Sequence, residues 1–285
     1  MSGFRNLSKT FRYINENGDS LIFEYDHGFL INKPSGIDTL AVSLSEAQGI
    51  DQVGSTIQSR NVKSRPVTVS GILTGAFQQE NKDRLISVIR PDLSGKLFAD
   101  DYYLTVSPTA TPAIEPKAAF AAFQFSLLAA YPYWQKDDSA SATLSGVAKR
   151  FKFPWNISKT YCFGEVITAK FINIRNGGQV PVPFTVTFTA LAEVVNPQIA
   201  DAATNNFLLV NKTLVAGERV VVEITHERTY VTSSVDGECR GALDLKSNYY
   251  RLAVGDNVIK PTAASGRENL QVDIDFATEI VGISL

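Results

Sequence analysis

The sequence predicts a mainly β protein of two domains, an N-terminal β-rich domain with one α-helix and a C-terminal domain of short strands. Three observations support this prediction. Apolar and polar residues alternate in many short segments, turn-forming residues lie between those segments, and 285 residues suit two domains of about 100–200 residues each. Alternation with a period of two is typical of strands that bury one face.

The alternating segments occur in both halves of the chain. Asn17-Gly18 lies between two of them, at 11–14 and 21–25, and favours a hairpin because both residues tolerate a positive φ. Other alternating runs follow the same pattern and are rich in the β-branched residues that suit a pleated surface. They lie at 40–45, 184–189, 220–225 and 272–277.

One segment predicts a helix, at about residues 78–90. It contains no glycine or proline before Pro91, which ends it because proline lacks the backbone N–H and restrains the residue before it. An apolar face is available for packing against the sheet. The residues of that face are Leu85, Ile86, Val88 and Ile89.

A domain boundary is expected between Trp134 and Trp155. The stretch 135–146 is polar and small, which is the composition of a linker, although an edge strand or an exposed hairpin fits it as well. We therefore predict an N-terminal domain over residues 1–137 and a C-terminal domain over residues 138–285. The short strands and Gly/Asn/Asp turns of the second domain are typical of a sandwich.

Composition and charge exclude several classes of partner. The chain carries 27 Lys and Arg against 29 Asp and Glu, a net charge of −2, and neither half is basic enough to bind nucleic acid through clustered cations. The longest apolar run, 118–130, is shorter than the roughly 20 residues that span a bilayer, so no membrane partner is expected. The first residues lack a secretory signal, which indicates synthesis in a cytoplasm.

Residues for catalysis or metal binding are scarce. The chain has two histidines, His27 and His226, and two cysteines, Cys162 and Cys239, and none of them has metal-ligand spacing. The cysteines are interpreted as buried thiols, or as a disulfide if their Cα atoms come within about 7 Å. Phosphate-loop and nucleophile-elbow motifs are absent. We therefore expect no enzymatic activity, no catalytic residues, no metal and no cofactor.

Several motifs, taken in their order along the chain, resemble one protein family. They are Arg65-Pro-Val-Thr-Val-Ser-Gly, the helix-and-turn segment 83–97, the strand 102–106, the strand 123–134 with its terminal Pro-Tyr-Trp, Ile174-Arg-Asn-Gly-Gly and the aromatic turn 249–259. This series resembles the distal tail protein of siphophages, the bacteriophages with long, non-contractile tails. The resemblance extends over nearly the whole chain.

The resemblance implies an assembly role in the virion. Its N-terminal domain would build a homohexameric ring, from which a galectin-like C-terminal β-sandwich projects. The ring would join the tail tube protein to the tail tip or baseplate, where a tail-associated lysin or fibre protein and receptor-binding proteins attach. DNA would pass through the lumen without sequence-specific binding, and the protein would be made in the host bacterial cytoplasm before it joins the tail.

A closed ring requires interfaces related by rotation, and protruding hairpins can supply them. The segment 36–65 is a candidate arm, because alternating apolar residues are followed by two glycines and a polar run. We predict that this arm packs on the neighbouring subunit, although an ordinary internal hairpin is the alternative. The candidate interface residues are Leu40, Val42, Leu44, Arg60 and Arg65.

Three other functions are compatible with a β-rich chain. A carbohydrate-binding adhesion module would use Trp134 and Trp155 as exposed rings, whereas buried core anchors are the alternative for these aromatics. A cell-wall glycosidase or peptidase would require a nucleophile or a carboxylate pair that no motif supplies. A tail-tube subunit would need only one of the two domains.

Overall fold

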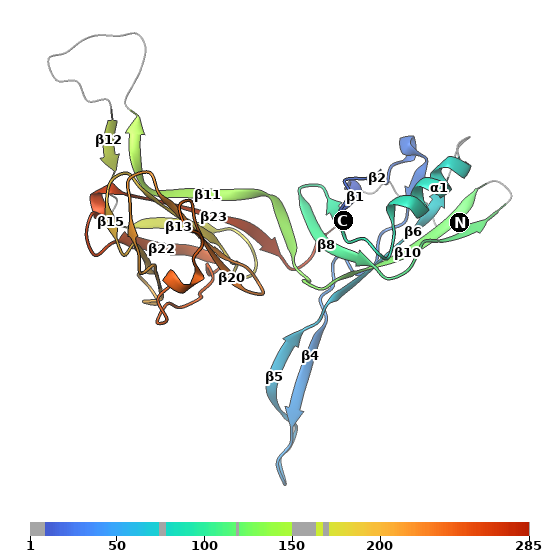
Figure 1. Cartoon of the computed structure of the whole chain (residues 1–285). Helices are drawn as coiled ribbons and strands as arrows, with labels where there is room; N and C mark the ends of the chain where they lie inside the picture. Colours follow the sequence, from blue (N-terminus) through green and yellow to red (C-terminus); the bar gives the residue numbers. More distant parts are fainter. Residues whose placement is uncertain (1–8, 74–77, 118–119, 150–163, 168–170, 285) are drawn as a thin grey trace. The chain divides into compact units, whose positions relative to one another are not determined.

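The computed structural model describes residues 9–73, 78–117, 120–149, 164–167 and 171–284. These residues form two compact units (Figure 1). Unit 1 contains Met1–Asp137 together with Glu279–Leu285, and unit 2 contains Asp138–Thr278. The predicted fold class is confirmed, because the described chain consists mainly of antiparallel strands and has one α-helix, in the N-terminal half.

Unit 1 is built from two antiparallel sheets. The first has the order β2-β1-β7-β8, and the second pairs β3 with β6, β6 with β10 and β10 with β9. A short antiparallel pairing of β10 with β8 joins the two sheets. Their buried side chains share one core. The strands are β1 Phe11–Asn15, β2 Ser20–Ile22, β3 Phe29–Ile31, β4 Val42–Ala47, β5 Thr56–Val62, β6 Arg65–Leu73, β7 Gly95–Ala99, β8 Tyr102–Pro108, β9 Ala113–Pro116 and β10 Ala121–Ala129, with the 3₁₀ turn η1 at Tyr25–His27.

The helix α1 spans Gln78–Val88, within the range predicted from the sequence. Leu85, Val88 and the following Ile89 are buried at the i, i+3, i+4 spacing that places side chains on one helix face. Ile86 points away from this face and is 44% exposed, so the buried face is narrower than the predicted one. Asn15 donates a hydrogen bond from Nδ2 to the carbonyl of Val88 and ties the end of the helix to β1.

Unit 2 is a β-sandwich of two sheets. One sheet contains β23-β14-β19-β20-β21, and the other contains β13-β22-β16-β17. The strands are β12 Gly164–Ile167, β13 Ile172–Asn176, β14 Thr185–Ala190, β15 Val194–Val195, β16 Gln198–Asp201, β17 Phe207–Leu209, β18 Thr213–Leu214, β19 Arg219–Ile224, β20 Thr229–Ser233, β21 Gly237–Glu238, β22 Gly255–Thr262 and β23 Leu270–Ile280, with the 3₁₀ turns η2 Arg240–Ala242 and η3 Arg267–Asn269.

The sandwich core follows the alternation read from the sequence. Val186 and Phe188 of β14 are fully buried, whereas the threonines that alternate with them, Thr185, Thr187 and Thr189, are half-buried. Val222 of β19 pairs with Val186 in register, and Ile274 of β23 flanks Val186 on its other side. These inward side chains belong to one continuous cluster with residues of the second sheet. Period-two patterning therefore predicted the buried face of these strands correctly.

Two segments at the junction of the units differ from simple expectations. The stretch 135–146, for which a linker, an edge strand and a hairpin were all compatible, lies in the strand β11 Trp134–Lys149. The sequence analysis placed residues 279–285 in the second domain, but the structure places Glu279–Leu285 in unit 1. The reason is specific hydrogen bonding: the Ile283 amide donates to the Ile37 carbonyl at 3.1 Å, and the carbonyl of Val281 accepts from Arg65.

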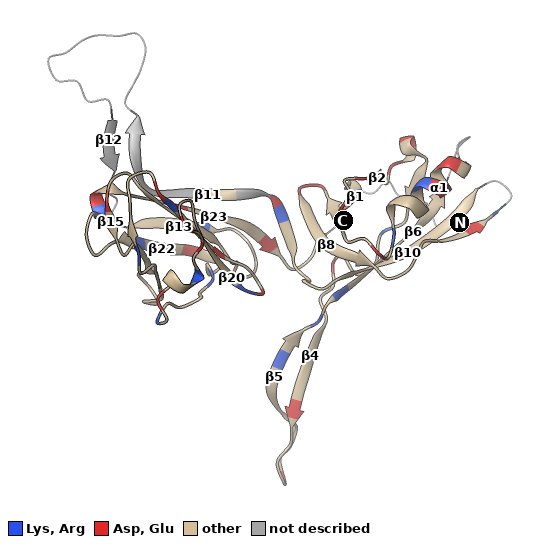
Figure 2. Ribbon diagram, viewed as in Figure 1, with Lys and Arg blue, Asp and Glu red and all other residues tan. Residues whose placement is uncertain are grey.

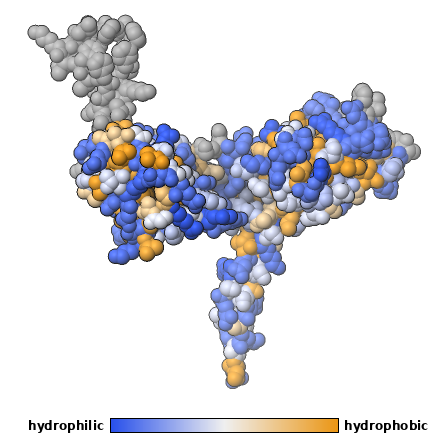
Figure 3. All heavy atoms as spheres, in the orientation of Figure 1, coloured by the Kyte–Doolittle hydropathy of each residue, from blue (hydrophilic) through white to orange (hydrophobic). Residues whose placement is uncertain are grey.

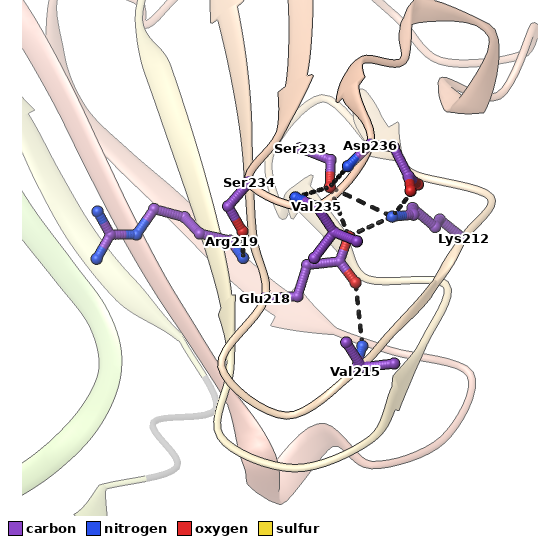
Figure 4. Close-up of polar contacts among 8 residues, drawn as sticks. All are labelled: Lys212, Val215, Glu218, Arg219, Ser233, Ser234, Val235 and Asp236. Carbon is purple, nitrogen blue, oxygen red and sulfur yellow. Dashed lines mark hydrogen bonds and ion pairs between the residues drawn. The ribbon is translucent and has the colours of Figure 1, made fainter.

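A buried polar network stabilises one end of unit 2 (Figure 4). The Glu218 carboxylate is 2% exposed and accepts hydrogen bonds from Lys212 Nζ, Ser233 Oγ and the Val215 amide. Lys212 also forms an ion pair with Asp236 at 2.6 Å. Burial raises the pKa of Glu218, but the hydrogen bonds from Lys212, Ser233 and the Val215 amide outweigh burial and lower the pKa below its ordinary value.

This network predicts an acid-sensitive contribution to stability. Glu218→Gln is expected to lower the free energy of unfolding by about 1–3 kcal/mol near neutral pH, because the buried side chain loses its charge-assisted hydrogen bonds and the half-buried Lys212 keeps only Asp236 as a charged partner. Since the folded pKa of Glu218 is depressed, its contribution is complete above the unfolded pKa and is lost as the pH falls through the folded pKa. Urea unfolding between pH 7 and pH 3 measures this.

The matched control is Glu223→Gln, which removes an exposed carboxylate from the adjacent strand β19. It should retain the wild-type dependence of stability on pH, whereas Glu218→Gln should flatten it. If the free energy of unfolding fell equally between pH 7 and pH 3 in Glu218→Gln and in the wild type, the network would contribute no pH-dependent stability.

Candidate subunit interface

The strands β4 and β5 form an antiparallel hairpin that extends from the sheets of unit 1 (Figure 1). Every residue of the two strands is exposed except the half-buried Ala47. A two-stranded hairpin is marginally stable on its own in water. Neither face of the hairpin is therefore covered by the rest of unit 1.

One face of the hairpin is apolar. Directly paired residues in an antiparallel ribbon point to the same face, and here Val42 pairs with Val62 and Leu44 pairs with Arg60. The exposed fractions of Val42, Leu44 and Val62 are 45%, 47% and 44%. Beyond an irregularity after Ser45, the pair Glu46–Ile57 continues the ladder.

The opposite face of the hairpin is polar. Ser43 pairs with Asn61, and Ser45 pairs with Ser59, so hydroxyl and amide groups occupy the positions between the apolar ones. The hairpin is thus amphipathic in the manner of a strand pair that packs one face on a partner and leaves the other in water. Charged residues of both signs are interspersed along unit 1, its hairpin and unit 2 (Figure 2).

The hairpin tip is also apolar. Ile50 is 98% exposed and Val53 is fully exposed, and hydrophobic atoms gather at the end of the hairpin (Figure 3). Two residues of the tip, Asp51 and Gly54, have positive φ and shape the turn. Large apolar side chains at full exposure on a projecting loop are typical of a site that another surface covers.

The predicted interface residues separate into two groups. Val42, Leu44 and Arg60 lie together on the apolar face, and the half-buried Leu40 precedes β4. Arg65 does not join them, because it is 2% exposed and its guanidinium is used inside unit 1. The structure therefore removes Arg65 from the candidate interface.

Arg65 instead fixes the root of the hairpin. Its Nε donates to the Pro132 carbonyl at 2.7 Å, and Nη1 donates to the carbonyls of Gly36 and Ile37 at 2.8 and 2.9 Å. Nη2 donates to the carbonyl of Val281 near the C-terminus. Burial lowers the pKa of Arg65, while nearby Asp38 opposes that shift. One side chain thus joins three segments that are distant in sequence.

The backbone beside Arg65 requires a glycine. Gly36 has a φ of +81°, and a Cβ atom there would lie 2.0 Å from the Pro66 carbonyl oxygen. The neighbouring Ile37 carbonyl also accepts a hydrogen bond from the indole Nε1 of Trp134 at 3.0 Å. Close packing around the root therefore holds both ends of the hairpin in place.

Sequence reasoning missed four apolar residues of the hairpin surface. Ile57 and Val62 lie in a stretch that looks polar on the whole, and Ile50 and Val53 lie in the tip. The strand register shows the contribution of the first two, because it pairs Val62 with Val42 and Ile57 with Glu46. The alternation of apolar and polar residues within 40–45 indicated the first strand of the hairpin, β4. A search for an antiparallel partner of that strand in the following residues could have found β5.

The residues considered for other chemistry do not converge. Trp134 is fully buried, so it cannot act as an exposed glycan-binding ring, and Trp155 lies outside the described residues. His27 is exposed, and Cys239 is a half-buried free thiol whose pKa is raised by burial, while Cys162 also lies outside the described part. Across the described ranges, no group of three His, Cys, Asp or Glu could hold a metal ion, and no helix is long and apolar enough to cross a membrane.

A β-sandwich combined with a β-rich domain that carries one helix is the layout that the resemblance to siphophage distal tail proteins implies. Residues 177–279 match the family described as siphovirus-type tail component, C-terminal domain. This match confirms the resemblance to siphophage tail components that the sequence motifs indicated. Among curated proteins, none matches the sequence.

The whole fold is similar to that of a particular tail protein, the Dit protein (gp 19.1) of phage SPP1. Its crystal structure is described as a paradigm of the hub adsorption apparatus in phages that infect Gram-positive bacteria. The match has a TM-score of 0.70 at 12% identity and covers 94% of this chain and 98% of Dit. A chain of the phage P2 baseplate, in its activated conformation with calcium, matches with a TM-score of 0.53 at 10% identity and covers 97% of this chain and 100% of its own.

The role assigned to Arg65 predicts a loss of stability without any loss of charge. Arg65→Lys is expected to lower the free energy of unfolding by about 2–4 kcal/mol, because one ammonium group cannot reach the carbonyls of Gly36, Pro132 and Val281 together. Urea unfolding followed by Trp134 fluorescence, in a Trp155→Phe background, reports on unit 1.

Arg60→Lys is the matched control, since Arg60 is exposed on the hairpin. That variant should stay within about 0.5 kcal/mol of its parent. Equal unfolding midpoints for the two lysine variants would contradict the anchoring role of Arg65.

Proposed function

We propose that this protein is a structural component of the phage virion, the distal tail hub, and that six copies form a ring through unit 1. The observation that carries the proposal is the uncovered apolar face of the β4–β5 hairpin. Each copy would place this face on the next subunit. The similarity to the hub protein Dit supports the choice of a ring, and the match over residues 177–279 supports a place in the tail.

The energetics favour such a contact. Full burial of a large aliphatic side chain contributes about 1.5–3 kcal/mol relative to exposure. Val42, Leu44, Ile57 and Val62 each retain roughly 45% exposure, and the tip residues Ile50 and Val53 are almost completely exposed. Covering them would contribute several kcal/mol per interface on the same scale. Repeated around a ring, this contribution would offset part of the entropic cost of association and favour closure.

The form of the contact follows from the shape of the hairpin. A projecting arm contacts a surface unlike itself, so the interface is heterologous. Such an interface generates a closed ring when the rotation that relates neighbouring subunits returns to the first subunit. Arg60, beside Leu44 on the apolar face, would add a charged contact that selects the register. Six as the number of subunits comes from the resemblance to distal tail proteins.

The hub would connect neighbouring components of the tail. Its ring would join the tail tube protein on one side and a tail-associated lysin or fibre protein on the other, with receptor-binding or baseplate proteins attached around it. DNA would cross the lumen without sequence-specific binding, which the interspersed charges of both signs support. The protein would be made in the host bacterial cytoplasm, would act at the tail tip by shape and association, and would need neither a cofactor nor a membrane.

Point variants on opposite faces of β4 test the arm. Leu44→Glu is expected to shift the purified protein from ring to monomer, because a carboxylate would be placed in an apolar contact. Ser45→Glu introduces the same charge at the next position, on the polar face, and should leave the ring assembled. Sedimentation velocity gives the mass of each variant, and equal assembly by both would contradict a one-sided interface.

Removal of the distal part of the arm is a coarser test. Deletion of residues 46–58 takes away the tip and the upper strand pairs but leaves the root at Arg65 in place. We expect monomers or short open oligomers by light scattering, with unit 1 still folded by circular dichroism. A ring that survives this deletion would show that the hairpin is not the subunit contact.

A further inference from the structure

A cavity in unit 2 brings together three arginines. It has a volume of about 350 Å³ and is lined by the β19–β20 turn, by η2 and by the segment that precedes Leu252. These three parts of the chain are distant in sequence. The residues that define its chemistry are Thr225, Arg228, Arg240, Tyr249 and Arg251.

The turn that carries Arg228 is tightly closed. The Thr225 amide donates to the Arg228 carbonyl at 2.9 Å, and the Thr225 hydroxyl donates to the same carbonyl at 2.8 Å. That hydroxyl also accepts a hydrogen bond from the Arg228 amide at 3.1 Å. The Arg228 guanidinium lies 5.3 Å from the ring centre of Tyr230. The backbone at this wall of the cavity is therefore fixed before any ligand arrives.

A second part of the cavity lining is positioned by a buried tyrosine. Tyr250 is 9% exposed and packs on Phe184 with ring centres 5.2 Å apart. Its two neighbours, Tyr249 and Arg251, are both exposed, and both line the cavity. Tyr249 is 57% exposed, so much of its ring is accessible to a ligand. The anchoring of Tyr250 thus presents an aromatic ring and a cation together.

The charge in the cavity is unbalanced. Arg228, Arg240 and Arg251 line the cavity together with one carboxylate, that of Glu227, and with the half-buried His226. Within the part of the chain that the structure describes, these three guanidinium groups make no side-chain hydrogen bond and no ion pair with protein. The whole chain has a net charge of −2, so this positive site is local. Guanidinium groups form bidentate hydrogen bonds with phosphate and carboxylate groups, and three guanidinium groups line this one concave site.

We propose that this cavity binds a saccharide that carries a phosphate or carboxylate group. The arginines would hold the anion, and the exposed Tyr249 ring would pack against the apolar face of the sugar. A volume of about 350 Å³ lies in the range of small-molecule pockets, which favours a compact sugar unit over an extended acidic peptide. This inference concerns unit 2 and holds whether or not unit 1 forms a ring.

Titration of the full chain tests the proposal. Glucose 6-phosphate, glucuronate, glucose, inorganic phosphate and hexaglutamate would each be added while NMR shifts are followed at low ionic strength. We expect saturable binding of one or both acidic sugars and at least about tenfold weaker binding of glucose. The sugar that binds more tightly shows whether the site prefers a phosphate or a carboxylate group. Added salt should weaken the binding. Absence of saturable binding by both acidic sugars, or tighter binding of hexaglutamate, would overturn the proposal.

Variants locate the site. Arg240→Gln with Arg251→Gln should weaken binding of the acidic sugar by about tenfold or more, because two charge-assisted contacts are lost. Arg175→Gln, an exposed arginine of β13 in the same unit that does not line the cavity, is the matched control and should bind normally. Tyr249→Ala should weaken binding of the acidic sugar more than binding of inorganic phosphate. Equal losses in the double variant and the control, or an unchanged sugar preference in Tyr249→Ala, would contradict the site.

Discussion

The buried guanidinium of Arg65 is the interaction on which the arrangement of unit 1 depends. A cation removed from water is costly unless its donors are satisfied, and here backbone carbonyls at Gly36, Ile37, Pro132 and Val281 satisfy them. The three segments must therefore come together whenever the chain folds. This requirement explains why the last residues return to unit 1 after the chain has passed through the whole of unit 2.

In the proposed ring, the same anchor would hold the hairpin in position as an interface element. Its root is held by Arg65 and by the Trp134 bond to Ile37, while its strands remain exposed. An arm with a fixed root loses less conformational entropy on binding than a loose loop would. Unit 2 has its own core and its own polar network, so it can carry a separate recognition surface without disturbing the arm.

Much of the fold could be predicted from the sequence because strand burial follows local alternation. The run 184–189 has a buried apolar face as expected. The equally regular run 40–45 is mostly exposed, because β4 and β5 form a separate two-stranded sheet that lies outside the core of unit 1. The burial of Arg65 could not be predicted, because a basic residue after a polar stretch is usually exposed on the surface. Its hydrogen-bond partners also lie up to 216 positions away in the sequence. The cavity in unit 2 could not be predicted from the sequence either, because its arginines come from three separate segments.

The central claim is that an amphipathic hairpin on a fixed root drives closed self-association. Negative-stain imaging of the purified full chain, with the native mass determined on the same sample, tests it most directly. The account predicts six-fold rings at six times the 31.1 kDa chain mass. Well-folded particles of single-chain mass at high protein concentration would contradict it.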